Sequence, residues 1–240
     1  MKNINELIEN DDLYQKMLVQ RCFDSKKNTV CYVIFNGTPR VIKWYPPGLK
    51  KNMDTEYTIL KKGAKTLNIP TVFKKDEKNI VLIQSYISGI NLCDYINDPQ
   101  IKLREKENTI QKLADWFVNF HDFFKTTDGY MIRGDAILRN FILKEDVWGV
   151  DFEEARLGKP IEDIAHITAS ILSTEPMFTD EKYHLGRLLI DIYQQNSVVH
   201  LDGLNEELSY ALLEISQWRP EQEELLRKYA QKIKIKGLKK

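Results

Sequence analysis

Cysteine, long apolar runs and an excess of charge of one sign are all scarce in this sequence. Three cysteines occur in 240 residues, and because an odd number without a close pair is not typical of a disulfide framework or a zinc site, we expect neither. No apolar run approaches the roughly 18 residues that cross a membrane, and no leader-like apolar segment stands near residue 1. These absences predict a soluble, cytoplasmic protein with an ordinary hydrophobic core.

The pattern of apolar residues changes once along the chain. The first part predicts a helix over 3–20, strands ending near Phe23 and over 29–35, 40–45, 69–72 and 79–87, and one main helix over 54–67. From residue 90 the periodicity becomes helical, with helices near 110–124, 161–173, 181–195, 204–217 and 220–232. We therefore predict an α+β protein with an N-terminal antiparallel sheet over 1–86 and a mainly helical part over 87–240.

The most informative stretch lies between residues 131 and 154. Two short apolar runs, 141–143 and 148–150, are separated by a polar turn and predict a hairpin. Asp135, Asn140 and Asp151 bracket this hairpin, and their oxygen atoms are the hard ligands that suit Mg²⁺. We expect Asn140 and Asp151 to share a metal ion, and Asp135 to accept a proton from an attacking hydroxyl group. Any one of these pieces alone would equally fit a polar turn between core strands.

Three segments in order resemble the protein-kinase-like superfamily, and within it the aminoglycoside and choline phosphotransferases. They are Arg133-Gly134-Asp135 through Asn140, then Val150-Asp151-Phe152-Glu153, and finally Gly158-Lys159-Pro160 through Asp163-Ile164-Ala165. Arg133 stands where this family usually has histidine, which leaves open how the loop is braced. The resemblance implies a bilobal fold, ATP and Mg²⁺ as cofactors, and transfer of the γ-phosphate to a hydroxyl group.

The resemblance also implies roles for residues of the first lobe. A lysine within the apolar strand 41–44 needs an anionic partner, so Lys43 is expected to bind ATP phosphates and Glu56 to orient it. The loop 24–28 contains no glycine, and its Ser25 and Asn28 are either phosphate contacts or parts of a plain turn. The further candidates are the backbones of Ser85 and Ile87 for adenine, Gln84 beside the back of the pocket, and Asp163 as a structural brace.

The acceptor is constrained by one short connection and by charge. Only eleven residues separate Asp151 from Asp163, too few for the segment that seats a peptide in protein kinases, which favours an amino sugar, an amino alcohol or a sugar. Residues 1–84 hold 15 basic and 9 acidic side chains, whereas residues 85–224 hold 13 and 26. The basic excess in residues 1–84 suits a nucleotide triphosphate, and the acidic excess in residues 85–224 suits a cationic or neutral acceptor. An ordinary solvated surface explains both charge distributions equally well.

Two other functions remain open at this level. The protein could be a kinase acting on a lipopolysaccharide core sugar or on a protein, or an inactive kinase-like module that binds nucleotide. Residues 225–240 carry seven basic side chains and no acidic one, so this tail could touch an anionic surface or be a solvated helix end. We expect no nucleic acid partner, and the sequence does not distinguish ATP from GTP.

Overall fold

The computed structural model describes residues 12–23 and 27–238 and divides the chain into two compact units. The first unit contains the residues up to Ser88 together with Asp151–Glu154, and the second contains Gly89–Val150 and the residues from Ala155 onward. The first is built on an antiparallel sheet and the second mainly on helices, so the predicted α+β class is confirmed.

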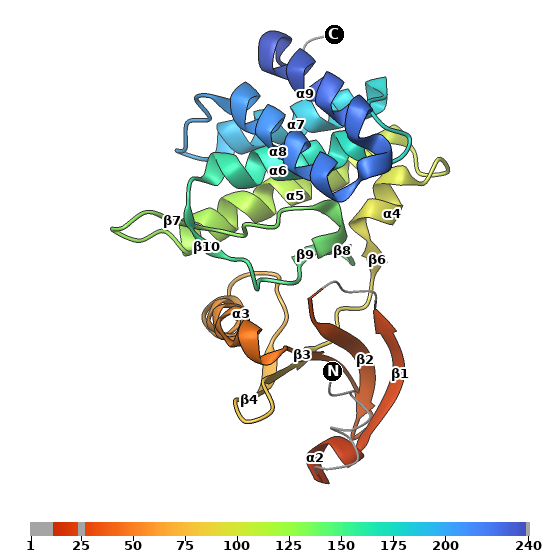
Figure 1. Ribbon diagram of the computed structural model, residues 1–240, viewed down its shortest axis with the longest axis vertical. Helices are drawn as coiled ribbons and strands as arrows, with labels where there is room; N and C mark the ends of the chain where they lie inside the picture. Colours follow the sequence, from red (N-terminus) through yellow and green to blue (C-terminus); the bar gives the residue numbers. More distant parts are fainter. Residues whose placement is uncertain (1–11, 24–26, 239–240) are drawn as a thin grey trace. The chain divides into compact units, whose positions relative to one another are not determined.

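The sheet of the first unit has the strand order β1-β2-β3-β5-β4, with every neighbouring pair antiparallel. Its strands are Met17–Phe23 (β1), Thr29–Phe35 (β2), Thr38–Trp44 (β3), Val72–Asp76 (β4) and Val81–Ser85 (β5). Helix α3 (Lys50–Gly63) packs against β4 and β5 and lies near β4 in Figure 1. Asn36 and Gly37 both have positive φ, the conformation that a tight hairpin between β2 and β3 requires.

Alternation along the strands separates the two faces of this sheet. Cys31, Val33 and Phe35 of β2 are buried on one face with Ile42 of β3 and Ile83 of β5. Because successive side chains of a strand point to opposite faces, Lys43 lies on the other face, yet it is only 2% exposed. The alternation in the sequence therefore predicts on which face of the sheet Lys43 lies. The burial of its side chain depends on the residues that cover this face.

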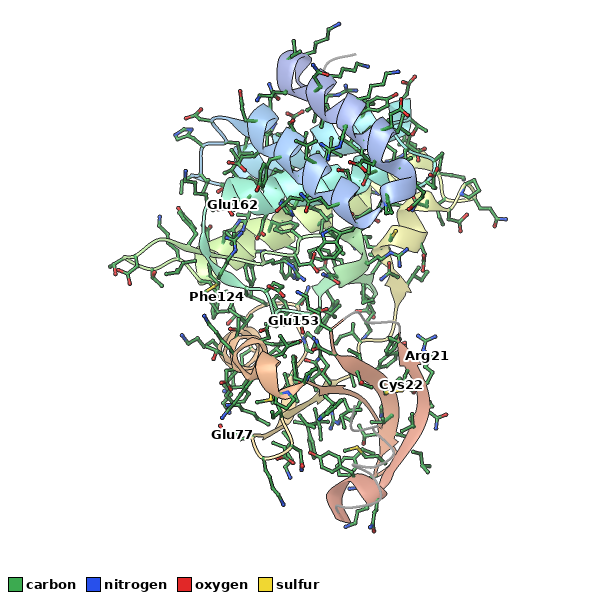
Figure 2. All side chains as sticks on the ribbon, viewed as in Figure 1. Arg21, Cys22, Glu77, Phe124, Glu153 and Glu162 are labelled. Atoms are coloured by element: carbon green, nitrogen blue, oxygen red, sulfur yellow. A yellow bond between two sulfur atoms is a disulfide. The ribbon has the colours of Figure 1, made fainter. Side chains whose placement is uncertain are left out.

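Two expectations for the first unit are wrong. The predicted helix over 3–20 is restricted, within the described residues, to α2 (Asp12–Gln15), because Met17 already begins β1. The expected absence of a disulfide is also wrong, since Cys22 and Cys31 are bonded. These cysteines stand nine positions apart in sequence, and the β1–β2 pairing places them directly opposite each other. Cys31 is buried as expected, whereas Cys22 is exposed on β1, where Figure 2 labels it.

The second unit is a set of packed helices with short strands at its loops. The helices are α4 (Leu92–Asn97), α5 (Leu103–Phe123), α6 (Pro160–Ser173), α7 (Asp180–Asn196), α8 (Leu204–Trp218) and α9 (Glu223–Lys236). Helix α7 packs against α5 and α6, and α8 packs against α6 and α9. The described part of the chain contains no helix long and apolar enough to span a membrane.

Two small sheets, one of three strands and one of two, complete the second unit. Strands β8 (Phe141–Leu143) and β9 (Val147–Gly149) form the predicted hairpin, and β6 (Ile90–Asn91) pairs with β8. Strand β7 (Tyr130–Ile132) pairs with β10 (Arg156–Gly158), and two 3-10 turns, Leu138–Asn140 and Pro220–Gln222, link the larger elements. The segment between β7 and β8 holds Asp135 and Asn140.

Candidate active site

Lys43 is the centre of the site in the first unit. It occupies β3 between Val30 of β2 and Leu82 of β5, so the backbone on both sides is fixed by the sheet. Its Nζ atom lies 2.6 Å from Glu56 Oε2, 2.7 Å from Asp151 Oδ1 and 3.5 Å from Glu153 Oε2. The structure thus brings Lys43, Glu56 and Asp151 together, although their part in nucleotide binding stays a prediction.

The negative charges next to Lys43 together affect its pKa more than burial does. Burial by itself lowers the pKa of a lysine, but the negative charges of Asp151 and Glu56 hold the pKa of Lys43 well above its usual value. Glu56 is fully buried and also accepts a hydrogen bond from the Tyr45 hydroxyl. Removing one member of a buried ion pair typically costs about 3–5 kcal/mol, because the other charge is left without compensation.

Three carboxylates in this unit could hold a divalent cation. Ligand atoms of Glu56, Asp151 and Glu153 lie within 4.8 Å of one another, and Lys43 makes an ion pair with each of them. Glu56 Oε1 is buried without a hydrogen-bond partner, and burial raises the pKa of Glu153. An excess of hard oxygen donors with an orphaned buried oxygen fits Mg²⁺. The sequence singled out Asp151 for this role and left Glu153 open.

The backbone at Asp151 and the loop before β2 add to this arrangement. Asp151 has a φ of 65°, in the left-handed region that Asp and Asn tolerate better than most residues. Glu153, labelled in Figure 2, accepts a hydrogen bond from Asn28 Nδ2, and Lys27 forms an ion pair with Glu154. Asn28 therefore contacts a carboxylate here. The predicted phosphate contact Ser25 lies outside the described residues.

The predicted adenine edge is at the end of β5. The amide of Ser85 donates to Thr71 O at 2.9 Å, and Ser85 Oγ accepts from the Thr71 amide at 3.0 Å. The amide of Ser85 is thus engaged by Thr71, and Ile87 follows β5 in an irregular segment, so the adenine contact stays a prediction. Gln84 is buried, and its Oε1 atom has no hydrogen-bond partner.

Asp163 organises the loop 133–140 of the second unit, which holds Asp135 and Asn140. Its Oδ2 accepts the backbone N–H of Arg133 at 2.7 Å, and its Oδ1 accepts that of Gly134 at 3.1 Å. His121 Nε2 lies 3.1 Å from Oδ2, while His121 Nδ1 lies 2.8 Å from the hydroxyl of Tyr193. Asp163 thus fixes the backbone at the start of this loop, as the predicted brace would. His121 and Tyr193 extend the hydrogen-bond network behind it, and no sequence motif identified either of them.

The loop is held by hydrogen bonds within itself and to α6 and Asn91. Asn140 Nδ2 donates to both the backbone oxygen and Oδ2 of Asp135, each at 3.0 Å. The backbone N–H of Leu138 donates to Ser170 Oγ of α6 at 3.0 Å, and Asn91 donates to the carbonyl of Arg139 at 2.8 Å. Because its nitrogen is engaged by Asp135, the amide of Asn140 has its oxygen as the group suited to a metal ion. Asn140 and Asp151 belong to different units, and shared metal binding by this pair stays a prediction.

These features define a class of protein. An antiparallel sheet with a buried Lys–Glu pair, followed by a helical unit carrying an Asp-x-x-x-x-Asn loop and then Asp-Phe, is the arrangement of the protein-kinase-like fold. No protein-family model matches the chain, and no curated protein matches its sequence.

Solved structures place this fold with the aminoglycoside phosphotransferases. The gentamicin complex of APH(2'')-IIa matches with a TM-score of 0.62 and 12% identity, covering 98% of this chain and 96% of that one. The ternary complex of the same enzyme with streptomycin and ATP matches with a TM-score of 0.60 and 14% identity, and 91% of each chain is covered. A protein from Ralstonia eutropha JMP134 classed with these enzymes matches with a TM-score of 0.62 and 14% identity, covering 83% of this chain and 80% of that one. At such low identity the likeness establishes the fold.

Proposed function

We propose that the protein is an ATP-dependent phosphotransferase that moves the γ-phosphate of ATP to a hydroxyl group of a small molecule, with Mg²⁺ as cofactor. The observation that carries this proposal is the buried contact of Lys43 with Glu56 and Asp151. A structural ion pair requires one carboxylate, whereas here three carboxylates converge and one buried oxygen has no partner. This excess favours a site that receives a divalent cation and phosphates.

Each side chain has a defined task in this mechanism. Phosphoryl transfer depends mainly on positioning and on neutralising charge. Lys43 would bind the α- and β-phosphates while Glu56 holds its ammonium group in place. Asp151 and Asn140 would hold Mg²⁺, with Glu153 as a further oxygen donor, and the bound ion would neutralise charge on the phosphates. Asp135, oriented by the Asn140 amide, would accept the proton of the attacking hydroxyl.

The acceptor is proposed to be an amino sugar, an amino alcohol or another sugar. The chain has no room for a peptide-seating segment between Asp151 and Asp163, where β10 and the start of α6 already occupy most of the eleven intervening residues. The APH(2'')-IIa structures contain gentamicin or streptomycin. We infer by likeness that aminoglycosides are the first acceptors to try.

One observation favours a second candidate, a nucleotide-binding module without turnover. The glycine-free loop before β2 is fastened to carboxylates through Lys27–Glu154 and Asn28–Glu153. A loop held in this way would not close over the phosphates of a bound nucleotide, and transfer depends on such close positioning. The two candidates differ in whether bound MgATP is consumed.

Replacing Asp135 by asparagine tests the proposal. The variant keeps an oxygen for the Asn140 amide but loses the proton acceptor, so the rate of transfer should fall about 10²–10⁴-fold, with nucleotide affinity changed less than about twofold. ADP formation would be measured with aminoglycosides, choline, ethanolamine and hexoses, and MgATP binding by calorimetry. Asp191→Asn, at an exposed position of α7, is the matched control. MgATP binding without turnover on any acceptor would support the inactive module, and Asp135→Asn with full activity would refute the proposed role.

A further inference from the structure

Arg133, in the position that is usually histidine in the family this chain resembles, is one of the largest fully buried side chains of the described structure. It is 1% exposed and follows directly after β7. Its own backbone N–H is fixed by Asp163. A guanidinium is always charged, and burying it requires compensation from several directions at once.

Two kinds of contact compensate this charge. Arg133 Nη2 donates to the carbonyl oxygen of Val150 at 2.7 Å. The guanidinium carbon lies 4.7 Å from the ring centroid of Phe141 and 5.5 Å from that of Trp116, within the range of cation–π attraction. A Cβ atom at Gly149 would clash with the Trp116 ring and come within 2.9 Å of Arg133 Nη1, so the glycine of β9 leaves room for both the ring and the guanidinium.

The carbonyl bonded by Arg133 belongs to the peptide that leads into Asp151. The N–H of Val150 donates to the carbonyl of Asn140 at 2.9 Å. The two backbone groups of Val150 are therefore bonded to residues at opposite ends of the catalytic loop, 133 and 140. Since the φ angle of Asp151 is measured from this peptide plane, fixing the plane fixes the point from which the Asp151 side chain departs.

We propose that Arg133 is a positioning residue that sets the backbone direction at Asp151 through the Val150 carbonyl. The proposal rests on the proposed function for its catalytic consequence. This positioning role differs from a purely structural role because Arg133 would act on Asp151, the residue proposed to bind the metal ion. A core arginine that only fills space would affect stability and leave the metal requirement unchanged.

Three variants separate these roles. Arg133→Met keeps the length and apolar stem but removes donor and charge, Arg133→Lys keeps the charge and a donor without the planar fork, and Arg104→Met at an exposed position of α5 is the control. Groups that orient metal ligands typically change metal affinity or activity about 10–100-fold when removed. We expect Arg133→Met to raise the half-saturating Mg²⁺ concentration and to lower kcat within that range. Arg133→Lys should fall between it and the wild type, and acceptor KM should change less than about twofold.

Two readouts do not depend on turnover. The Mg²⁺ concentration needed for ATP to raise the melting temperature should increase in Arg133→Met, and amide hydrogen exchange should become faster in peptides covering 148–154 while the α7 and α8 peptides stay unchanged. A folded Arg133→Met with wild-type Mg²⁺ dependence and unchanged exchange at 148–154 would overturn the proposal. If Arg133→Met does not fold, the same two measurements on Arg133→Lys decide the question, and wild-type values in that variant would overturn the proposal. A wild type that binds MgATP and never transfers phosphate would refute the proposed function, and the binding and exchange measurements would still decide the role of Arg133.

Discussion

The two units each bury a lysine, and the two lysines have opposite pKa shifts. Lys43 of the first unit is 2% exposed and Lys182 of the second is 1% exposed. Lys43 lies among carboxylates, which hold its pKa well above the usual value despite burial. Burial lowers the pKa of Lys182 to about 8, with a smaller contribution from the positive charge of Lys106. Similar burial therefore gives a firmly charged group in one unit and a readily deprotonated one in the other.

The partners explain this difference. Lys182 Nζ donates to Asn97 Oδ1 and, at 2.6 Å, to Thr174 Oγ1, both of which are neutral. Cys93, Glu175 and Glu181 act on it only at longer range and raise its pKa by less than burial lowers it. A lysine that must meet phosphate at neutral pH has to remain charged, which Lys43 does. Lys182 has the surroundings of a structural group that anchors α7 to α4 and to the end of α6.

The largest effect should come from Lys43→Met. Removing the ammonium leaves the fully buried Glu56 facing Asp151 and Glu153 without a cation, which should destabilise the first unit by about 3–5 kcal/mol. The loss would be measured by urea denaturation at pH 7. It should be partly recovered in the double variant Lys43→Met/Glu56→Gln, because the amide removes the orphaned charge.

A matched control sharpens the Lys43 comparison. Lys78→Met changes an exposed lysine of the same unit and should alter the free energy of unfolding by less than about 0.5 kcal/mol. A Lys43→Met variant as stable as this control would show that the carboxylates do not depend on the ammonium. The comparison between the two buried lysines would then fail.

Lys182 should give the next largest effect, and only in a defined pH window. An unfolded lysine has a pKa of about 10.4, so between pH 8 and about 10.4 the unfolded chain binds a proton that the folded chain does not. The contribution of Lys182 to the free energy of unfolding therefore rises with pH across that window. At 1.36 kcal/mol per pKa unit, the rise amounts to at most about 3 kcal/mol. Denaturation at a series of pH values should show this rise in the wild type relative to Lys182→Met. Parallel pH profiles for the two proteins would contradict the lowered pKa.

The elements of both units could be read from the sequence because their apolar periodicities are clear. Helices α5 to α9 and strands β2, β3 and β5 lie close to their predicted ranges. The apolar residues at 7, 13, 17 and 18 also fit a helical period, which predicts a helix through Met17–Val19, but pairing with β2 overrides that pattern. Periodicity describes one segment at a time and carries no information on such a partner strand.

The candidate residues of the site could be named from the sequence where motif spacing identifies them. Lys43, Asp135, Asn140, Asp151 and Asp163 come from ordered motifs, and their roles stay predictions. By contrast, the bond from Arg133 to Val150 and that between Cys22 and Cys31 join residues whose proximity depends on strand register. The disulfide also bears on compartment, since such bonds are rare in the reducing cytosol, and cytoplasmic location stays a prediction.

The smallest effect should come from Glu153→Gln, and it tests whether the carboxylates around Lys43 exceed what one ammonium can balance. Burial raises the pKa of Glu153 above its ordinary value of about 4.5. The folded protein therefore holds this proton more tightly than the unfolded chain, so the contribution to stability is complete below pH 4.5 and is lost as pH rises through the higher folded pKa. At pH 7 the glutamine variant should be slightly more stable than the wild type in EDTA, and the difference should vanish near pH 4. Added Mg²⁺ should reverse the order at pH 7, because it compensates the wild-type carboxylate and finds one fewer charged ligand in the variant. A variant less stable than the wild type in EDTA at pH 7 would mean that Lys43 already balances all three carboxylates, leaving no excess charge for a metal ion to neutralise.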